Sequence, residues 1–244
     1  MRFDILTLFP AMVKGPLQES VLHKASQKGL LEFFIHDLRS FTHDKHHITD
    51  DVSYGGGPGM VMKPEPIFEA VRSLVGAPKS PRIILMTPAG RPFSHTLAHE
   101  LSREDRLIFI CGHYEGVDER VREQLVTDEI SIGDYVLTGG ELPALVVMDA
   151  VARLVPGVVG DPDSVAQDSF ENGLLDFPHY TRPDTFEAME IPEVLKSGHH
   201  GEIAVWRRQQ ALKRTVLRRP DLLQNVSLTD ADQKYLQDVL AGNG

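Results

Sequence analysis

Short apolar runs alternate with helix-like stretches through the first two thirds of the chain, and this alternation constrains the fold more than any other feature. The apolar runs predict strands at residues 2–9, 31–37, 82–87, 106–111 and 129–132. The stretches between and after them predict helices at residues 16–28, 64–75, 94–102, 117–125 and 141–155. This order is typical of an α/β layered domain with a largely parallel sheet.

The pattern changes near residue 160, where prolines and glycines interrupt it. We predict one domain over residues 1–160, a linker over 161–175 and a small helical domain over 176–244. Residues 161–193 hold nine acids and one base, whereas residues 207–219 hold six bases and no acid. No strand is predicted after the linker. Residues 185–244 are expected to form short helices and one longer helix that ends at Pro220.

Composition excludes several classes of protein. A net charge of −10 argues against a protein that coats nucleic acid by general attraction. The single cysteine, Cys111, excludes an internal disulfide and a zinc site built from cysteines. The apolar runs are too short to span a bilayer, and the N-terminus resembles no signal peptide. We therefore expect a cytoplasmic protein with no membrane partner.

A glycine cluster occupies residues 55–59 and reads Gly-Gly-Gly-Pro-Gly. It lacks the Gly-Lys-Ser/Thr ending of a phosphate-binding loop, and it does not join a clear strand to a helix as a dinucleotide fingerprint would. Two interpretations remain open. The cluster is either a surface loop or a backbone surface that a ligand can approach closely.

Three predicted strands end in turn-forming residues. These ends lie at residues 85–88, 111–116 and 130–140. Because ligands of α/β sheets bind outside the carboxyl ends of strands, the three loops together can wrap a nucleoside. Gly112 and Gly140 are expected where the backbone must come close to its surroundings, so a branched side chain there should block binding. Ordinary tight turns explain any one loop taken alone.

Some charged side chains and histidine pairs have a regular spacing but an open meaning. Asp149 and Arg153 are four residues apart in the apolar helix predicted over 141–155. They fit either an ion pair within the helix or a guanidinium presented to a substrate. The pairs His43/His47 and His95/His99 have the spacing of metal ligands in a helix, but neither has a third ligand nearby. No metal site is predicted.

The basic stretch predicts a helix with two separate faces. Arg207, Arg214 and Arg218 share one face, and the apolar residues Val205, Leu212 and Val216 lie roughly opposite. Alanine at the three arginines should therefore spare the fold. The basic face either grips phosphates or is simply solvated. Trp206 lies between the faces and can either pack or stack on a base.

Long motifs in this chain resemble one known family. Residues 112–120 read Gly-His-Tyr-Glu-Gly-Val-Asp-Glu-Arg, and residues 131–141 read Ser-Ile-Gly-Asp-Tyr-Val-Leu-Thr-Gly-Gly-Glu. Further matches are residues 3–10, 54–60, 168–170 and 206–207. Together they resemble the bacterial tRNA (guanine-N1)-methyltransferases, the TrmD family of the SPOUT superfamily, over nearly the whole chain.

The resemblance implies a fold, a reaction and partners. It implies a first domain with a deep trefoil knot, which no sequence pattern could predict because knots are nearly absent from proteins. The implied enzyme transfers a methyl group from S-adenosyl-L-methionine to N1 of the guanosine immediately 3′ of the tRNA anticodon, at position 37. It also implies a homodimer with shared active sites, dependence on Mg²⁺, and no DNA partner.

The resemblance further assigns roles to residues. Asp168 is the general base, which sequence reasoning alone cannot separate from Asp161, Asp163 or Asp176, and Arg153 stabilises charge on the guanine O6. The residues expected to bind the methyl donor come from the three strand ends and, for the last of them, from the helix predicted over 141–155: Leu85, Thr87, Pro88, Gly112, Tyr114, Glu115, Ser131, Ile132, Gly133, Tyr135, Val136, Leu137, Gly139, Gly140 and Pro143.

Two other classes of protein remain as alternatives. A non-catalytic nucleotide- or RNA-binding protein on the same scaffold would need the basic helix but neither Asp168 nor Arg153. An ordinary Rossmann methyltransferase or reductase is disfavoured, because the dinucleotide fingerprint is missing.

Overall fold

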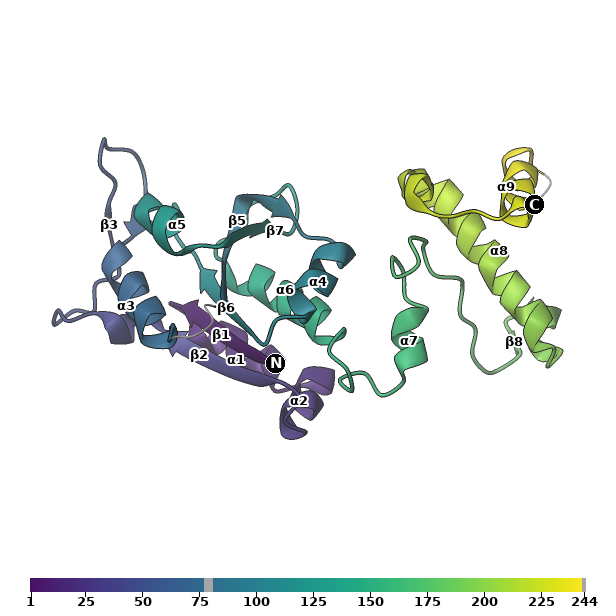
Figure 1. Ribbon diagram of the computed structural model, residues 1–244, viewed down its shortest axis with the longest axis horizontal. Coiled ribbons are helices and arrows are strands. Elements are labelled where there is room, and N and C mark those ends of the chain that lie inside the picture. The colour runs from purple at the N-terminus through teal and green to yellow at the C-terminus, as the bar shows by residue number, and fades with distance from the viewer. Residues whose placement is uncertain (77–80, 243–244) are drawn as a thin grey trace. The chain divides into compact units, whose positions relative to one another are not determined.

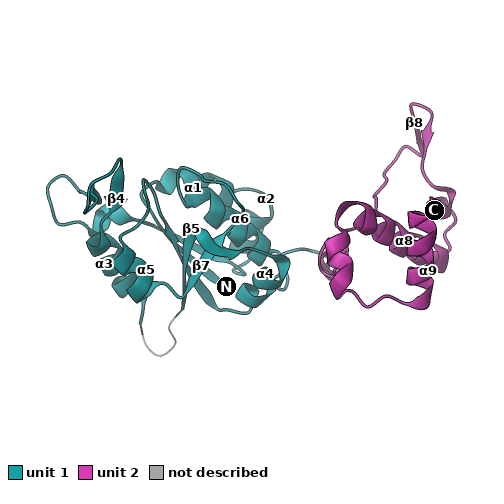
Figure 2. Cartoon of the chain, turned by 90° about the horizontal axis from the view of Figure 1, so that it is seen from above, with its two compact units in different colours: residues 1–161 teal, residues 162–244 magenta. Residues whose placement is uncertain are grey.

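The computed structural model describes residues 1–76 and 81–242. The chain divides into two compact units, residues 1–161 and residues 162–244 (Figure 2). Each unit has a hydrophobic core of its own.

The first unit is built on a five-stranded sheet whose paired strands all run parallel. Its order is β2-β1-β6-β5-β7. The strands are β1 Arg2–Thr7, β2 Glu32–Asp37, β5 Arg82–Pro92, β6 Arg106–Cys111 and β7 Asp128–Ser131. The inner strands β1 and β6 are buried almost throughout, which is why they read as continuous apolar runs in the sequence.

Helices cover both faces of this sheet (Figure 1). Alternate residues of β6 point to opposite faces, so Phe109 packs in one apolar cluster and Ile110 in the other. The cluster around Phe109 is closed by α1 Pro10–Leu17, α2 Ser20–Gln27, α4 His95–Ser102 and α6 Glu141–Ala152. The cluster around Ile110 is closed by η1 Leu38–Phe41, α3 Pro64–Leu74 and α5 Glu119–Leu125. Residues 1–161 therefore form the predicted α/β layers.

The glycine cluster lies in a loop between two short antiparallel strands, β3 Asp50–Val52 and β4 Met60–Met62. Hydrogen bonds tie β4 to the loop that follows β6: Met62 N donates to Gly116 O at 2.9 Å, and Glu115 N donates to Met60 O at 3.0 Å. Gly59 has a positive φ, and a Cβ on it would stand 2.4 Å from the carboxylate of Glu115. The cluster is thus a hairpin loop next to one of the predicted ligand-binding loops.

The structure corrects several predicted element bounds. The helix predicted over 16–28 is two helices, and the first of them, α1, already begins at Pro10. The second, α2, begins at Ser20, whose φ of +51° is incompatible with a continuous α-helix through this residue. The helix predicted from residue 117 begins at Glu119, because Asp118 is its N-cap and its side chain accepts a hydrogen bond from the backbone N–H of Arg120. The helix predicted over 141–155 ends at Ala152.

The second unit consists mainly of helices. Its elements are α7 Pro162–Ala166, β8 Thr185–Phe186, β9 Met189–Glu190, η2 Glu193–Lys196, α8 His200–Arg218, η3 Pro220–Asn225 and α9 Asp230–Leu240. Leu212 of α8 and Leu236 of α9 centre its small core. Arg208 of α8 forms an ion pair with Asp232 of α9 at 3.0 Å, and this side chain of Asp232 also closes a capping box with Thr229.

The two-stranded sheet β8–β9 contradicts the expectation that no strand follows the linker. Each strand is only two residues long, and Glu187 and Ala188 connect them with positive φ angles of 48° and 64°. A two-residue hairpin turn of this kind normally carries asparagine, aspartate or glycine. The sequence therefore contained neither a long strand signal nor the usual turn residues.

Candidate functional site

A pocket of about 610 Å³ lies in the first unit, beside the middle of β5 and the carboxyl ends of β6 and β7. We call it the strand-end pocket. Its size is that of a cavity for a nucleoside-sized ligand. All residues assigned to the methyl donor line it, namely Leu85, Thr87, Pro88, Gly112, Tyr114, Glu115, Ser131, Ile132, Gly133, Tyr135, Val136, Leu137, Gly139, Gly140 and Pro143.

The loop after β7 runs back against the loop after β6 in close backbone contact. Gly140 N donates to Gly112 O at 2.8 Å, and His113 forms an isolated antiparallel bridge with Gly139. A Cβ on Gly140 would stand 2.7 Å from the Cα of Cys111, a distance that backbone atoms cannot relieve without moving. We call this contact the loop crossing.

The two glycines expected to need close approach differ in this respect. A Cβ on Gly112 would meet only the side chain of Val117, at an ordinary contact distance of 3.7 Å. The chain itself therefore requires glycine at position 140 but leaves room at position 112. The expectation that a branched side chain at either position blocks donor binding stays a prediction.

Two buried polar atoms lie behind the loop crossing. Glu141 Oε1 accepts a hydrogen bond from Thr7 Oγ1 at 2.6 Å, whereas Glu141 Oε2 and His113 Nδ1 have no hydrogen-bond partner among the described residues. A Cβ on Gly139 would stand 2.4 Å from that Glu141 oxygen and 2.8 Å from the His113 nitrogen. Glycine at position 139 thus leaves room for both side chains.

Aromatic contacts hold one wall of the pocket. The ring of His113 lies 4.7 Å from that of Phe9 and 4.8 Å from that of Tyr114, measured between centroids. Tyr114 has a φ of +58°, which is uncommon for a residue with a Cβ. The nearby Cys111 is fully buried, and burial together with the charge of Glu141 raises the pKa of its thiol well above the ordinary value. Cys111 therefore stays protonated and is unsuited to act as a nucleophile.

Sequence reasoning missed some residues that line the strand-end pocket. Arg122 of α5 and Glu129 of β7 both line it and form an ion pair at 3.2 Å. Arg122 lies on a helix, whereas all predicted residues except Pro143 came from strand ends. The signal that could have found Glu129 is its place beside Ile130 in a predicted strand.

A second pocket, of about 430 Å³, lies in the second unit, and we call it the α8 pocket. It is lined by Gln167, Asp168, Asn172, Leu174, Leu175, Asp176, Phe177, His200, Ile203, Ala204, Arg207, Arg208 and Ala211. The structure thus brings together Asp168, the predicted base, and Arg207 of the predicted basic face. Asp176, an alternative that the sequence left open, also lines this pocket, and its carboxylate contacts His179 at 2.7 Å.

The basic face of α8 makes more internal contacts than predicted. The guanidinium of Arg207 lies 4.8 Å from the ring centroid of Phe177, and Arg214 Nη1 donates to Asp176 O at 2.9 Å. Two of the three arginines therefore contact the segment at residues 176–177, which the helical wheel did not predict, and the effect of their removal on the fold stays a prediction. Arg218 is exposed.

The apolar side of α8 also differs from the prediction. Leu212 is buried in the core of the second unit, but Val205 is largely exposed. Trp206 is half-buried, and its ring lies 6.4 Å from that of Tyr180. Trp206 therefore packs within its own unit.

The other residues with an open meaning lie in the first unit. Arg153 follows the last residue of α6, is exposed, and donates its backbone N–H to Asp149 O at 3.1 Å. His43 contacts Glu69 at 2.8 Å, whereas His47 contacts Thr42 at 2.9 Å, so the two histidines face different neighbours.

The parallel sheet and the strand-end pocket define an α/β protein with a pocket of nucleoside size beside the carboxyl ends of β6 and β7. The family model described as tRNA (Guanine-1)-methyltransferase TrmD matches residues 1–225. The chain belongs to this family.

Curated relatives cover almost the whole chain. A tRNA (guanine-N(1)-)-methyltransferase of Dehalococcoides mccartyi is 55% identical over 242 residues, which are 99% of this chain and 98% of the relative. The proteins of the same name from Pelotomaculum thermopropionicum and Geotalea uraniireducens are 56% and 57% identical, over 99% and 98% of this chain and 97% of each relative. Among the described residues, no helix has the length and apolar character needed to cross a bilayer.

Proposed function

We propose that the protein transfers a methyl group from S-adenosyl-L-methionine to N1 of the guanosine at tRNA position 37, immediately 3′ of the anticodon. The observation that carries this proposal is the strand-end pocket, because residues far apart in the sequence meet there in a chain that belongs to a methyltransferase family. The tRNA substrate places this reaction in the cytoplasm.

The strand-end pocket is the site of the methyl donor in this proposal. Gly112, Gly139 and Gly140 line one side without side chains of their own, and Tyr114 and Tyr135 contribute aromatic surface. When bound, the donor supplies an electrophilic methyl carbon whose bond to sulfur breaks as the bond to N1 forms. The loop crossing supports a knotted chain at this site, as the family resemblance implies.

Asp168 is the general base in this proposal. N1 of guanine carries a proton and becomes a good nucleophile only when that proton leaves, and a carboxylate can accept it. The α8 pocket supports the assignment, because Asp168 lines a cavity large enough for a nucleobase together with Phe177 and Arg207. A positioned base contributes about 10²–10⁴ in rate.

Arg153 complements this base. As the proton leaves N1, negative charge spreads onto the guanine O6, and a guanidinium can stabilise it by hydrogen bonds aimed at that oxygen. Arg153 supports this role by its exposed place beyond the last turn of α6. The remaining acceleration comes from alignment of N1, the methyl carbon and sulfur.

The family resemblance also implies Mg²⁺, which prefers a set of oxygen ligands. Among the described residues, no three carboxylates lie close enough together to supply such a set. We therefore assign no residue to Mg²⁺ and route no step through it.

The enzyme acts as a homodimer in this proposal. Met12 of α1 and Leu142 and Val146 of α6 are large apolar side chains with about half of their surface exposed, and α1 packs against α6. An exposed apolar face on adjacent helices fits a partner surface of the same kind. With this face at the interface, one subunit supplies the strand-end pocket and the other supplies Asp168 to each active site.

Mixed dimers test the shared site. Subunits carrying Asp168→Ala and subunits carrying Gly140→Val should each be inactive, but their heterodimer should regain activity because one site combines an intact pocket with an intact Asp168. Tagged subunits would show that heterodimers form. Heterodimers without activity would contradict a site shared between subunits.

The reaction itself is tested with labelled S-adenosyl-L-methionine and an unmodified tRNA transcript. We expect label in 1-methylguanosine after digestion of the tRNA, and none when the guanosine at position 37 is replaced by adenosine. Donor binding without transfer would contradict the proposed reaction and would instead support a non-catalytic nucleotide-binding protein.

A further inference from the structure

Strand β5 has a bulge in the wall of the strand-end pocket. Met86 and Arg91 both pair with Ile130 of β7, so residues 87–90 leave the ladder between them. Thr87, Pro88 and Ala89 of this bulge line the pocket. A bulge of this kind changes the direction of the side chains that it carries, so its shape affects the pocket directly.

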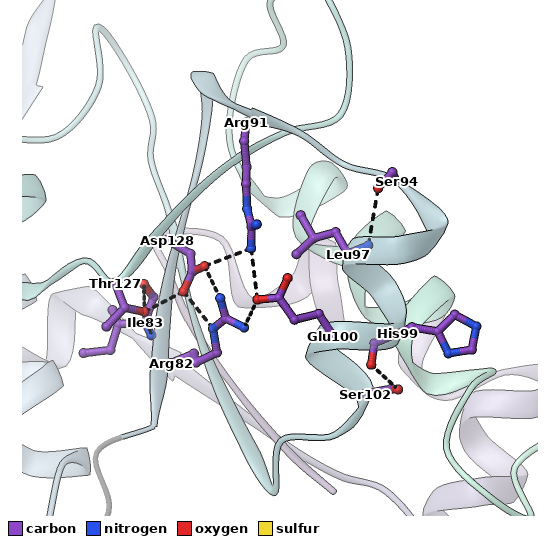
Figure 3. Close-up of polar contacts among 10 residues, drawn as sticks. All are labelled: Arg82, Ile83, Arg91, Ser94, Leu97, His99, Glu100, Ser102, Thr127 and Asp128. Atoms are coloured by element: carbon purple, nitrogen blue, oxygen red, sulfur yellow. Dashed lines mark hydrogen bonds and ion pairs between the residues drawn. The ribbon is translucent and has the colours of Figure 1, made fainter. Parts of the chain in front are cut away.

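Charged side chains link the start of β5 to the residue that follows the bulge (Figure 3). Arg82, before the bulge, donates through Nε to Asp128 at 2.9 Å and through Nη1 to Glu100 at 2.6 Å. Arg91, directly after the bulge, places Nη2 3.3 Å from Asp128 and 3.4 Å from Glu100. Each arginine thus contacts both carboxylates, and we call these four residues the clasp.

Asp128 is the fixed anion of the clasp. Its side chain is 6% exposed, and Thr127 Oγ1 donates to it at 2.7 Å. Burial alone would raise the pKa of Asp128, but the hydrogen bonds from Arg82 and Thr127 outweigh burial and hold the pKa below its ordinary value. Asp128 therefore remains charged at neutral pH.

Arg91 is the adjustable part of the clasp. Its side chain is 48% exposed, and its two contacts are longer than those of Arg82. The preceding Gly90 lies against the backbone of β7, where a Cβ would stand 2.4 Å from Ile130 N. No side chain can pack at that point, so Arg91 supplies the first side-chain contacts after the bulge.

We propose that Arg91 is a positioning residue for the methyl donor, because its contacts with Asp128 and Glu100 hold residues 87–90 in the shape that lines the pocket. The inference rests on the proposed function, which assigns the strand-end pocket to S-adenosyl-L-methionine. Arg91 acts through the bulge. Its loss weakens donor binding and leaves the rate at saturating donor unchanged.

The test compares Arg91→Met, which keeps most of the side-chain length but removes the charge, with Arg91→Lys, which restores a charge. The matched control is Arg103→Met, because Arg103 is an exposed arginine just beyond α4 and outside the clasp. Calorimetry with S-adenosyl-L-methionine should show about three- to fivefold weaker binding for Arg91→Met, the range expected for a partly exposed ion pair. Arg91→Lys should recover part of the affinity, and Arg103→Met should match the parent.

A second readout separates positioning from a general loss of structure. In protein with labelled alanine methyl groups, the Ala89 signal should broaden or shift in Arg91→Met, while the signal of Ala98, buried in α4, should not change. Steady-state kinetics should show a raised KM for the donor with an unchanged kcat.

The outcomes distinguish this inference from the proposed function. A parent protein that does not bind S-adenosyl-L-methionine would contradict the proposed function. A parent that binds it, with equal affinity and an unchanged Ala89 signal in Arg91→Met, would contradict only the role of Arg91. Equal weakening in Arg91→Met and Arg103→Met would also overturn that role, because it would show a general effect of charge.

Discussion

The two units form their pockets in different ways. The strand-end pocket is shaped largely by backbone, with glycines at the loop crossing and a bulge in β5, and it lies on a sheet whose two faces are both covered. The α8 pocket is lined by apolar side chains together with polar and charged ones, on a small core centred on Leu212 and Leu236. In the first unit, we therefore expect the shape of the pocket to depend mainly on the path of the backbone. In the second unit, single side chains are expected to set both the chemistry and the local structure.

The largest expected effect concerns Asp168. Asp168→Asn keeps the shape of the side chain but removes the base, so kcat should fall by about 10²–10⁴ while donor affinity stays close to that of the parent. Single-turnover kinetics would measure the rate and calorimetry the affinity. Asp238→Asn, at an exposed position of α9, is the matched control. Near-normal turnover of Asp168→Asn would remove Asp168 from the mechanism.

The loop crossing gives the next effect. Gly140→Val should weaken donor binding by about fivefold or more, because overpacking against the backbone of Cys111 costs about 1–3 kcal/mol. Gly112→Ala, whose added methyl meets only Val117 at an ordinary distance, should preserve thermal stability. Thermal unfolding and donor titration of both variants would check this. Similar stability of Gly140→Val and the parent would show that the crossing is not tightly packed.

The arginines on the basic face of α8 should differ in whether their removal affects stability. Arg218→Ala should leave stability unchanged and, if this face grips tRNA phosphates, lower the slope of log affinity against log salt by roughly 0.7–0.9. Arg214→Ala should also reduce stability by about 1 kcal/mol, because it removes the hydrogen bond to the carbonyl of Asp176. Fluorescence of Trp206, the only tryptophan, would follow unfolding of the second unit. An unchanged salt slope in Arg218→Ala would identify a solvated position.

The smallest expected effect is the loss of stability at low pH. Burial alone would raise the pKa of Asp4 in β1, but hydrogen bonds from His36, Arg2 and Arg106 outweigh it and hold the pKa well below the ordinary value of 3.8. In the second unit the hydrogen bond from Arg208 lowers the pKa of Asp232. Because the pKa of each carboxyl is lower in the folded state than in the unfolded state, each carboxylate contributes fully to the free energy of unfolding well above pH 3.8. This contribution is lost as the pH falls through the pKa of the folded state.

The buried Asp4 should make the first unit more sensitive to this loss. Thermal unfolding would be followed between about pH 5 and pH 2, with circular dichroism for the whole chain and Trp206 fluorescence for the second unit. Asp4→Asn should flatten the acid dependence of the first unit. An acid dependence that is equally steep in Asp4→Asn would show that other carboxyl groups cause it.

Structural features that depend on residues adjacent in the sequence could be predicted. The apolar runs of β1 and β6 and the glycines that follow β6 and β7 were visible as local patterns, so the parallel sheet and the loops of the strand-end pocket could be expected. The resemblance to a known family then singled out Asp168, which no local pattern distinguished from other acids of the same segment.

Contacts between distant residues could not be predicted in this way. Arg82 and Asp128 are 46 positions apart, and Arg214 and the carbonyl of Asp176 are 38 apart, so no periodicity relates either pair. The helical wheel placed Arg207 and Arg214 on the polar side of α8 but could not show that residues 176–177 return to cover that side. The wheel describes one helix, whereas the packing depends on the path of the chain around it.

The complete burial of Cys111 has a practical consequence. It is the only thiol in the chain and lies where the loop after β7 meets the end of β6, so a thiol-specific reagent can modify it only while this part of the molecule is transiently open. The modification rate, measured by mass spectrometry on the unaltered sequence, therefore reports the frequency of local opening beside the loop crossing. This measurement needs no engineered probe, and a ligand that bridges the loop crossing would lower the modification rate.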